Sequence, residues 1–291
     1  MTRLLVNGIH LNVEVSGPAD ATALMLLHGF TGDATTWEPF LDAWLSIQTI
    51  RVDLIGHGRS DSPADPARYG MAHAVEDLLA VLDHLGVERA AVLGYSMGGR
   101  VGLHLSTAAP DRLSTLIVES ASPGIEDDAQ RAARRASDEA LAADIERDGI
   151  AAFVDRWQAQ PLFASQASLP AAVRERQRRQ RLRQSPAGLA NSLRGMGAGA
   201  QEYLLPRLAS LRTQTLFIAG ALDERYVAEA RRMAAAVRGA GLAVLPGAGH
   251  AAHLEQSEAF AATVGQFLRT TPVGIAGQRP LQRHHHKGVT S

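Results

Sequence analysis

Residues 93–100 read LGYSMGGR and place one serine, Ser96, between two glycines, Gly94 and Gly98, in a G-x-S-x-G pattern. An apolar run at 90–93 precedes the pattern, and helical spacing follows it over 98–109. Between a strand and a helix, this pattern forms a sharp turn that exposes the serine hydroxyl, and its glycines let the strand and the helix approach each other. A glycine-rich turn with an incidental serine is the alternative. The stretch therefore predicts an α/β fold with Ser96 at the end of a strand.

Outward from this turn, short apolar runs alternate with segments of helical spacing. This alternation is typical of βαβ crossovers and predicts a mostly parallel central sheet flanked by helices. The predicted strands are 11–15, 23–27, 50–54, 90–93, 116–118, 215–219 and 242–245, and the predicted helices are 36–45, 77–85, 98–109, 226–237 and 257–268.

Residues 124–206 interrupt this alternation with an arginine-rich helical segment. We interpret the segment as a helical cap inserted into one discontinuous core domain, which comprises residues 1–123 and 207–270. Residues 271–291 have no periodicity and are predicted to form a disordered tail. Its histidines at 284–286 fit an inert polar end better than a metal site.

Composition excludes several classes of function. The 29 basic and 30 acidic side chains leave a net charge of −1, which favours neither nucleic acid nor an anionic membrane as a partner. There is no cysteine, so disulfides and a cysteine nucleophile are excluded. The N-terminus does not resemble a signal peptide, and no apolar run approaches the roughly 20 residues of a membrane helix. We expect a cytoplasmic protein.

A serine hydroxyl needs a histidine to take its proton and a carboxylate to orient that histidine. In this strand-turn-helix context the partners follow in the order serine, acid, histidine, each after a later strand. Asp223 follows the predicted strand 215–219, and His250 follows 242–245. We therefore predict a catalytic triad of Ser96, Asp223 and His250. Less suitable candidates by position are His28, His57, His104 and His253, and Asp53 fits a carboxylate that organises a loop.

An oxyanion site is expected beside this serine. One donor is the N–H of the residue after the serine, Met97. The other is the N–H of Phe30, in the turn LLHGFTGD (26–33) that follows the predicted strand 23–27. Two such donors contribute roughly 3 kcal/mol each to a developing oxyanion.

Together these features resemble the α/β-hydrolase superfamily over residues 1 to about 270. Further motifs resemble the MenH family, the 2-succinyl-6-hydroxy-2,4-cyclohexadiene-1-carboxylate synthases of menaquinone and phylloquinone biosynthesis. The segments that carry the resemblance are HGFTGDATTW (28–37), GYSMGGR (94–100), ESASPGIEDDAQRAARRASD (119–138), WQAQPLF (157–163), GLANSLRGMGAGAQ (188–201) and GAGHAAHLE (247–255). The segments within 124–206 carry most of the weight, because esterases share the others.

The resemblance implies a lyase. We expect no cofactor or metal, because the predicted site uses only side chains and backbone N–H groups and the sequence lacks an obvious metal-ligand cluster. Members of the family remove a proton next to a succinyl carbonyl and expel pyruvate from an enolpyruvyl group. Ser96, activated by His250, would be the base, and the N–H groups of Phe30 and Met97 would hold the enolate-like oxygen.

The implied substrate is a small molecule with three carboxylates, which guanidinium groups bind in a two-pronged geometry. Arg100, one helical turn after Ser96, is expected near the pocket. By resemblance, further substrate-binding residues are Tyr95, Arg134, Trp157 and Arg181, and Arg135 is an alternative to Arg134. The chain departs from the family in two places: Arg225 replaces the usual lysine, and QEYLLPRL (201–208) lacks a tryptophan.

Two other functions remain open. The first is a carboxylic-ester or carbon–carbon hydrolase that uses the same triad, which an aliphatic cap without inward-facing arginines would favour. The second is a non-catalytic ligand-binding protein of the same fold, which predicts a degraded triad. The oligomeric state is not determined by the sequence.

Overall fold

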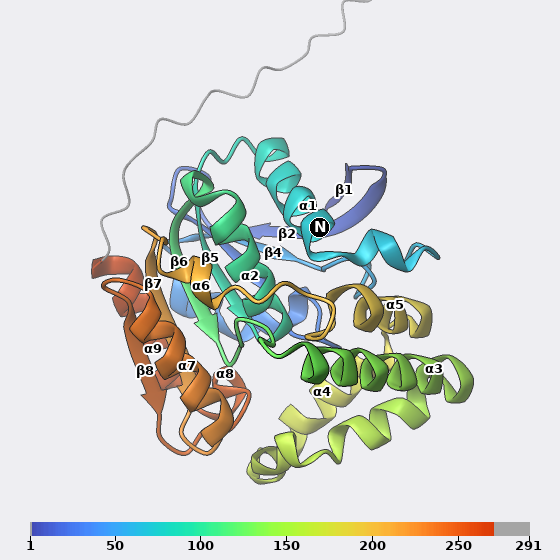
Figure 1. Cartoon of the computed structure of the whole chain (residues 1–291). Helices are drawn as coiled ribbons and strands as arrows, with labels where there is room; N and C mark the ends of the chain where they lie inside the picture. The colour runs from blue at the N-terminus through green and yellow to red at the C-terminus, as the bar shows by residue number, and fades with distance from the viewer. Residues whose placement is uncertain (1, 271–291) are drawn as a thin grey trace, which may run out of the picture.

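The computed structural model describes residues 2–270, which form one eight-stranded sheet covered by helices (Figure 1). The α/β-hydrolase fold class predicted from the sequence is confirmed. The strands are β1 (Thr2–Val6), β2 (Ile9–Ser16), β3 (Ala23–Leu27), β4 (Gln48–Val52), β5 (Ala90–Tyr95), β6 (Leu113–Glu119), β7 (Gln214–Gly220) and β8 (Gly241–Leu245).

The strand order is β1-β2-β4-β3-β5-β6-β7-β8. Only β2 runs antiparallel to its neighbours within this sheet, and the pairs from β4 to β8 are parallel. The chain leaves β3 toward β4 but leaves the adjacent strand β5 toward β6. This reversal opens a crevice at the carboxyl ends of β3 and β5, which is where ligands bind in open α/β sheets. The fold therefore places the loop after β3 beside Ser96.

Alternate side chains of the buried strands face two separate hydrophobic layers. On β3, Met25 and Leu27 pack with α1 (Met71–His84), α2 (Met97–Ala108) and α7 (Glu224–Ala236). Leu24 and Leu26 face the other layer, which includes Trp37 and Phe260. That layer is formed by η1 (Ala34–Phe40), η2 (Asp42–Trp44), α8 (Ala252–Glu255) and α9 (Ser257–Thr270).

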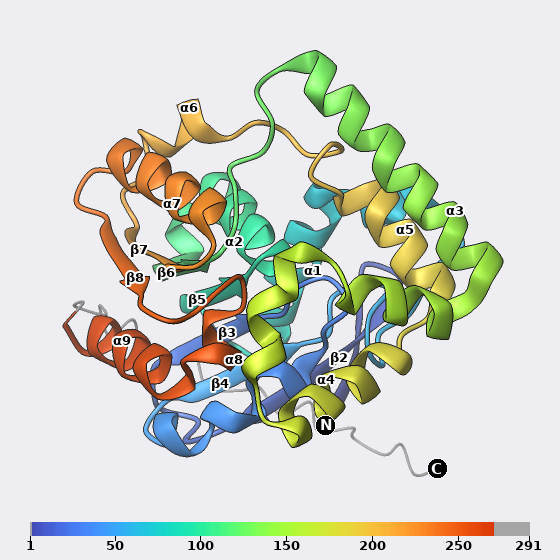
Figure 2. The same ribbon diagram turned by 90° about the horizontal axis from the view of Figure 1, so that it is seen from below.

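Helices fill the chain between β6 and β7, as the sequence pattern predicts. They are α3 (Asp128–Gln158), η5 (Pro161–Ser168), α4 (Ala171–Leu182), α5 (Pro186–Met196) and α6 (Leu205–Leu208). The two views show α3, α4 and α5 gathered together at one end of the molecule (Figures 1 and 2). A small apolar cluster joins α3 to α5 through Ile145, Phe153 and Leu189, and Phe30 of the core packs against it. The boundaries of the predicted cap, 124 and 206, stay a prediction.

The helix predicted over 36–45 is wrong in type. The segment forms the two 3₁₀ helices η1 and η2, and Pro39 lies inside η1. Proline has no N–H to donate, and in an α-helix its ring clashes with the carbonyl group four residues earlier, so a regular α-helix through Pro39 is disfavoured. The predicted helix 77–85 begins earlier, at Met71, after the short η3 (Pro66–Tyr69). Short η4 (Pro110–Arg112) separates α2 from β6.

No helix within residues 2–270 is both long and apolar enough to span a bilayer. The predicted disordered tail, residues 271–291, lies outside the described residues.

Candidate active site

Ser96 occupies a strained turn between β5 and α2. Its backbone has φ 50° and ψ −105°, a region that non-glycine residues rarely adopt and that costs on the order of 1–3 kcal/mol. Two glycines make the turn possible. A Cβ on Gly94 would lie 2.2 Å from the carbonyl oxygen of Gly98, and one on Gly98 would lie 2.3 Å from that of Leu27. The serine is thus held at the end of the strand by close backbone contacts.

Asp223 and His250 reach Ser96 from later strands. Asp223 follows β7 and caps α7, accepting the N–H of Tyr226 at 3.3 Å. Its Oδ2 atom lies 2.8 Å from Nδ1 of His250, and Nε2 of His250 lies 3.1 Å from Oγ of Ser96. His250 is buried, which shields these contacts from water. The three residues predicted as a triad are therefore connected by hydrogen bonds in the order that proton transfer from the serine needs.

The predicted oxyanion donors lie at the same edge of the sheet. Met97 is the first residue of α2, where an N–H group has no partner within the helix. Phe30 follows β3 through Gly29, whose Cβ position would lie 2.6 Å from the ring of Tyr95 and 3.5 Å from Cβ of Ser96. This close approach brings the loop of Phe30 beside the serine. Phe30 and Met97 both line the cavity that contains Ser96.

A cavity of about 380 Å³ opens onto Ser96 and His250. It lies between the carboxyl edge of the sheet and the helices of the segment between β6 and β7. Its lining includes six residues predicted for substrate binding or the oxyanion site, together with several that the sequence reasoning did not select. The predicted ones are Phe30, Tyr95, Met97, Arg100, Arg134 and Trp157, and the additional ones include Ser122, Asp138, Gln160, Phe163, Ser192, Arg225 and Tyr226.

Arg100 lines the cavity one turn after Ser96, as expected. Its guanidinium donates at 2.6 Å to the carbonyl oxygen of Met196 and at 2.6 Å to Oε1 of Gln201. Burial lowers the pKa of Arg100 to about 10, so the group stays charged at neutral pH. These hydrogen-bond partners are neutral oxygens, so within residues 2–270 its charge has no compensating carboxylate in direct contact.

Arg134, not Arg135, lines the cavity. The Nε atom of Arg134 donates to Oδ1 of Asp138 at 2.8 Å, one turn along α3. The other oxygen of Asp138 has no partner within the described residues. Arg135 faces the backbone of Gly199, with an N···O distance of 3.4 Å. The register of α3 therefore places Arg134 in the cavity lining and turns Arg135 away from it, a choice that the sequence left open.

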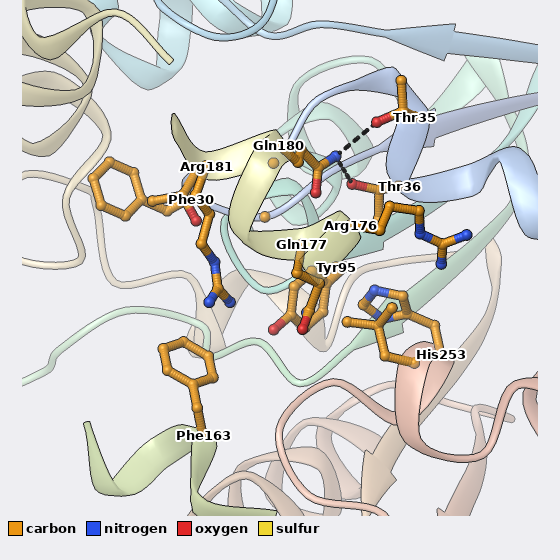
Figure 3. Close-up of a pocket in the computed structure, with 14 residues that line it drawn as sticks. Phe30, Thr35, Thr36, Tyr95, Phe163, Arg176, Gln177, Gln180, Arg181 and His253 are labelled. Atoms are coloured by element: carbon orange, nitrogen blue, oxygen red, sulfur yellow. Dashed lines mark hydrogen bonds between the residues drawn. The ribbon is translucent and has the colours of Figure 1, made fainter. Parts of the chain in front are cut away.

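Arg181 is set apart from the other arginines. It lines an adjoining pocket of about 50 Å³ whose walls share Phe30, Tyr95 and Phe163 with the main cavity. Figure 3 shows its guanidinium extending toward Tyr95 and Phe163. The guanidinium carbon lies 5.2 Å from the centre of the Phe163 ring, and burial lowers the pKa of Arg181. The side chain is 8% exposed and forms no ion pair within residues 2–270.

Aromatic rings separate the two pockets. Trp157 packs edge-on against Phe30 at 5.3 Å and lies 5.6 Å from Phe163, between ring centres. Its indole N–H is buried without an acceptor in the described part of the chain. Burial raises the pKa of Tyr95 well above its usual value, so its hydroxyl stays protonated and can donate. Both residues line the cavity that opens onto the serine.

The less suitable candidates form structural contacts. His28 accepts the N–H of Leu54 at 3.0 Å, and its other ring nitrogen lies 2.8 Å from the carbonyl oxygen of Gly29. Burial lowers the pKa of His57 to about 3 and that of His104 to about 4. Asp53 accepts the N–H groups of Ala34 and Arg59 and the amide of Asn12, and so organises three loops as its position suggested.

Several cavity residues had little signal in the sequence. Arg225 was singled out only as a departure from a family pattern, and the structure places it and Tyr226 in the lining, with the guanidinium 5.7 Å from the Tyr226 ring. Both lie within one helical turn after Asp223, at the start of α7. This closeness to the predicted catalytic acid was the only feature of the sequence that could have identified them. Phe163 and Asp138 come from the segment between β6 and β7, where no periodicity shows which face points inward.

Comparisons with known proteins agree with this geometry. A family model described as the alpha/beta hydrolase fold matches residues 22–257. A 2-succinyl-6-hydroxy-2,4-cyclohexadiene-1-carboxylate synthase of Serratia proteamaculans (strain 568) is 32% identical over 87% of this chain and 95% of its own length. A Bacillus subtilis (strain 168) protein whose name provisionally assigns it the same synthase activity is 38% identical over 90% of this chain and 96% of its own length.

Among solved structures, MenH from S. aureus superposes with a TM-score of 0.85 and 34% sequence identity. The match covers 89% of this chain and 98% of that chain. The similarity therefore extends through both the sheet and the helical segment between β6 and β7.

Proposed function

The chain belongs to the alpha/beta hydrolase fold family and, within it, to the 2-succinyl-6-hydroxy-2,4-cyclohexadiene-1-carboxylate synthases, and from this premise we propose that it is a carbon–oxygen lyase. Its substrate would be 2-succinyl-5-enolpyruvyl-6-hydroxy-3-cyclohexene-1-carboxylate, and its products pyruvate and the cyclohexadiene for which the family is named. This reaction belongs to menaquinone or phylloquinone biosynthesis.

Two guanidinium groups carry this proposal: neither the partly buried Arg100 nor the buried Arg181 pairs with a carboxylate within residues 2–270. Arg100 lies in the cavity of Ser96, and Arg181 lies behind the shared wall of Tyr95 and Phe163. A buried charge without a partner is costly, and an anionic ligand compensates it. Arg134 and Arg225 add positive charge to the cavity, and Asp138 opposes it. The balance favours a substrate with several carboxylates over a neutral ester.

The chemical step follows from the hydrogen-bonded triad. His250, oriented by Asp223, takes the proton of Ser96, and Oγ then removes the proton next to the succinyl carbonyl. The N–H groups of Phe30 and Met97 stabilise the negative charge that develops on the carbonyl oxygen. The electron pair of the broken C–H bond at C2 forms the C2=C3 double bond, the electron pair of the C3=C4 double bond moves to C4=C5, and the C5–O bond to the enolpyruvyl group breaks. Pyruvate leaves as its enolate, which is protonated to pyruvate.

Substrate contacts are assigned on the same basis. Arg100, Arg134 and Arg181 would each bind a carboxylate, and the free indole N–H of Trp157 and the protonated hydroxyl of Tyr95 supply neutral donors. A cytoplasmic location and the small-molecule tricarboxylate as the partner are part of the proposal.

Incubation with the enolpyruvyl substrate tests the function directly. We expect stoichiometric release of pyruvate together with the ultraviolet absorbance of a conjugated diene. A carboxylic-ester hydrolase would instead cleave p-nitrophenyl acetate efficiently and release no pyruvate. Rapid ester cleavage without pyruvate release would replace the lyase assignment with a hydrolase one.

A further inference from the structure

Glu119 is a buried carboxylate at the end of β6 that the chemical step does not use. Its side chain is fully buried. The Oε1 atom accepts the backbone N–H of His253 at 3.0 Å. The ring atom Nδ1 of His253 lies 2.9 Å from Oε1 and 3.0 Å from Oε2. Both carboxylate oxygens therefore contact a single residue, which lies three positions after His250.

The backbone of Glu119 contacts the serine turn at the same time. Its carbonyl oxygen accepts the N–H of Ser96 at 2.8 Å, and Glu119 is the register partner of Tyr95 in the parallel pair β5–β6. One residue thus joins the turn that carries Ser96 to the loop that carries His250. Any shift of its carboxylate changes the distance between these two segments.

The loop around His250 has little regular structure of its own. α8 is a single turn, so few backbone hydrogen bonds hold the segment. Hydrogen bonds from its backbone N–H groups to carboxylates hold it in addition. Glu255 accepts the N–H of Gly249 at 2.7 Å and that of Ala251 at 3.3 Å, on either side of His250. Glu119 holds the next part of the loop through His253.

The ring of His253 also fixes Tyr95. The two rings meet edge-on with their centres 4.5 Å apart, and the Tyr95 ring lies 5.5 Å from that of His250. Gly29 also lies against this ring, because a Cβ there would lie 2.6 Å from it. Figure 3 shows His253 beside Tyr95, and both residues line the smaller pocket. Tyr95 is thus packed against both His253 and the loop after β3.

We propose that the Glu119–His253 pair is a positioning device that sets His250 and Tyr95 relative to Ser96. The pair acts through the hydrogen bond from the His253 ring to the carboxylate. For Tyr95 the inference rests on the proposed function, whereas for His250 it concerns only the activation of Ser96.

Labelling of Ser96 by an alkyl fluorophosphonate measures that activation independently of the natural substrate. The Oγ–P bond forms, fluoride leaves, and His250 takes the hydroxyl proton. His253→Leu removes the ring donor, and we expect the second-order labelling rate to fall roughly 10- to 100-fold, as for a misplaced catalytic group. His253→Asn keeps a donor near the position of Nδ1, so its rate should stay within about threefold of the unmodified protein.

Glu119→Gln is the second variant, and it keeps only one acceptor oxygen. We expect a fall of about tenfold in its labelling rate. The matched control is Asp77→Asn, which alters another buried carboxylate, bonded to Arg68 at 2.7 Å and to Asn7 at 2.9 Å, away from the site. Its labelling rate should equal that of the unmodified protein, and a lower melting temperature there shows the cost of losing a buried carboxylate alone.

The outcomes separate positioning from stability. Equal losses in His253→Leu and His253→Asn, or unchanged labelling in His253→Leu and Glu119→Gln, would overturn the proposal. For pyruvate release, His253→Leu should lower kcat by the same factor as labelling, with KM within about threefold. The variants could change the labelling rate as expected while no form of the protein, the unmodified one included, releases pyruvate. That result would reject the proposed function and leave the positioning role of the Glu119–His253 pair intact.

Discussion

The Oγ atom of Ser96 lies 3.1 Å from Nε2 of His250, although 154 positions separate the two residues in the sequence. The carboxyl ends of β5 and β8 bring them to one edge of the sheet, and Asp223 after β7 completes the hydrogen-bonded chain at 2.8 Å. The arrangement depends on the fold as a whole, since each residue follows a different strand.

Removal of any member of this chain should abolish most of the activity. For Ser96→Ala, Asp223→Asn and His250→Ala we expect kcat for pyruvate release to fall about a thousandfold or more, with little change in melting temperature. Because the three residues act as a unit, the double variants should be hardly slower than the single ones. Near-normal pyruvate release from Ser96→Ala would refute the mechanism.

Loss of a buried arginine should weaken recognition of a carboxylate. Arg100→Ala and Arg181→Ala should each cost about 2–4 kcal/mol in kcat/KM for pyruvate release. The Arg→Lys variants should recover only part, because lysine keeps the charge and loses the two-pronged geometry. Arg134→Ala should cost less, because Asp138 already pairs with Arg134 and the side chain is 40% exposed.

The control for the arginine series is Arg179→Ala, on the same helix as Arg181. Arg179 is 62% exposed and pairs only with Glu175 within the described residues, at 3.5 Å. The kcat/KM of the Arg179→Ala variant for pyruvate release should stay unchanged. Cleavage of p-nitrophenyl acetate should hardly respond to any of the arginine substitutions. Equal depression of ester cleavage and pyruvate release would count against a tricarboxylate pocket.

The turn at Ser96 should not tolerate a side chain on Gly98. A methyl group there would lie 2.3 Å from the carbonyl oxygen of Leu27, so α2 or the end of β3 must shift. We expect Gly98→Ala to lower the free energy of unfolding by about 2–4 kcal/mol, measured by chemical denaturation. At Gly70 the same methyl group would meet only Ala67, at 3.5 Å, so Gly70→Ala should be nearly neutral. Similar losses in the two variants would contradict this explanation.

Burial of His57 should make the protein sensitive to mild acid. Burial lowers the folded-state pKa of His57 to about 3, below the usual value of 6.5. Below pH 6.5 the unfolded chain therefore binds a proton that the folded protein does not, and stability falls as the pH decreases from 6.5 toward 3. The loss from this residue alone is about 2 kcal/mol at pH 5.

The variant His57→Asn isolates this contribution. The difference between its unfolding free energies at pH 7.5 and pH 5 should be smaller than that of the unmodified protein by about 2 kcal/mol. His73→Asn, at a side chain that is 48% exposed, controls for the loss of an imidazole. An unchanged difference in His57→Asn would show that another group governs the acid response.

The sequence predicted the features that depend on residues close together in the chain. The G-x-S-x-G pattern and the apolar runs predicted the sheet, and the order of Ser96, Asp223 and His250 placed each at a strand end, where the structure has them. The type of η1 was missed although Pro39, which disfavours an α-helix, is visible in the sequence. Pattern alone was insufficient where a side chain contacts a distant element, because the separation of Arg181 from the main cavity depends on how α4 packs over Phe163.

The contact between Glu119 and His253 is of the same kind. Glu119 ends a buried strand and His253 lies on a single helical turn, and the two are 134 positions apart. From the sequence, His253 was only a less suitable candidate for the triad, and Glu119 was not singled out. Only the pairing of β5 with β6, and the return of the chain after β8, bring them together behind Tyr95.

The insertion of helices between β6 and β7 has a consequence for the order in which the protein matures. Ser96 is synthesised before the helical segment, and Asp223 and His250 after it. On the ribosome, β3 to β6 can pair early, but β7 adds to the edge of β6 only after the intervening helices have emerged. Pairing between such distant segments is slow, and an unpaired strand edge is open to association with other chains. A nascent chain that stalls within the helical segment would expose the edge of β6 and hold a serine turn that lacks its base.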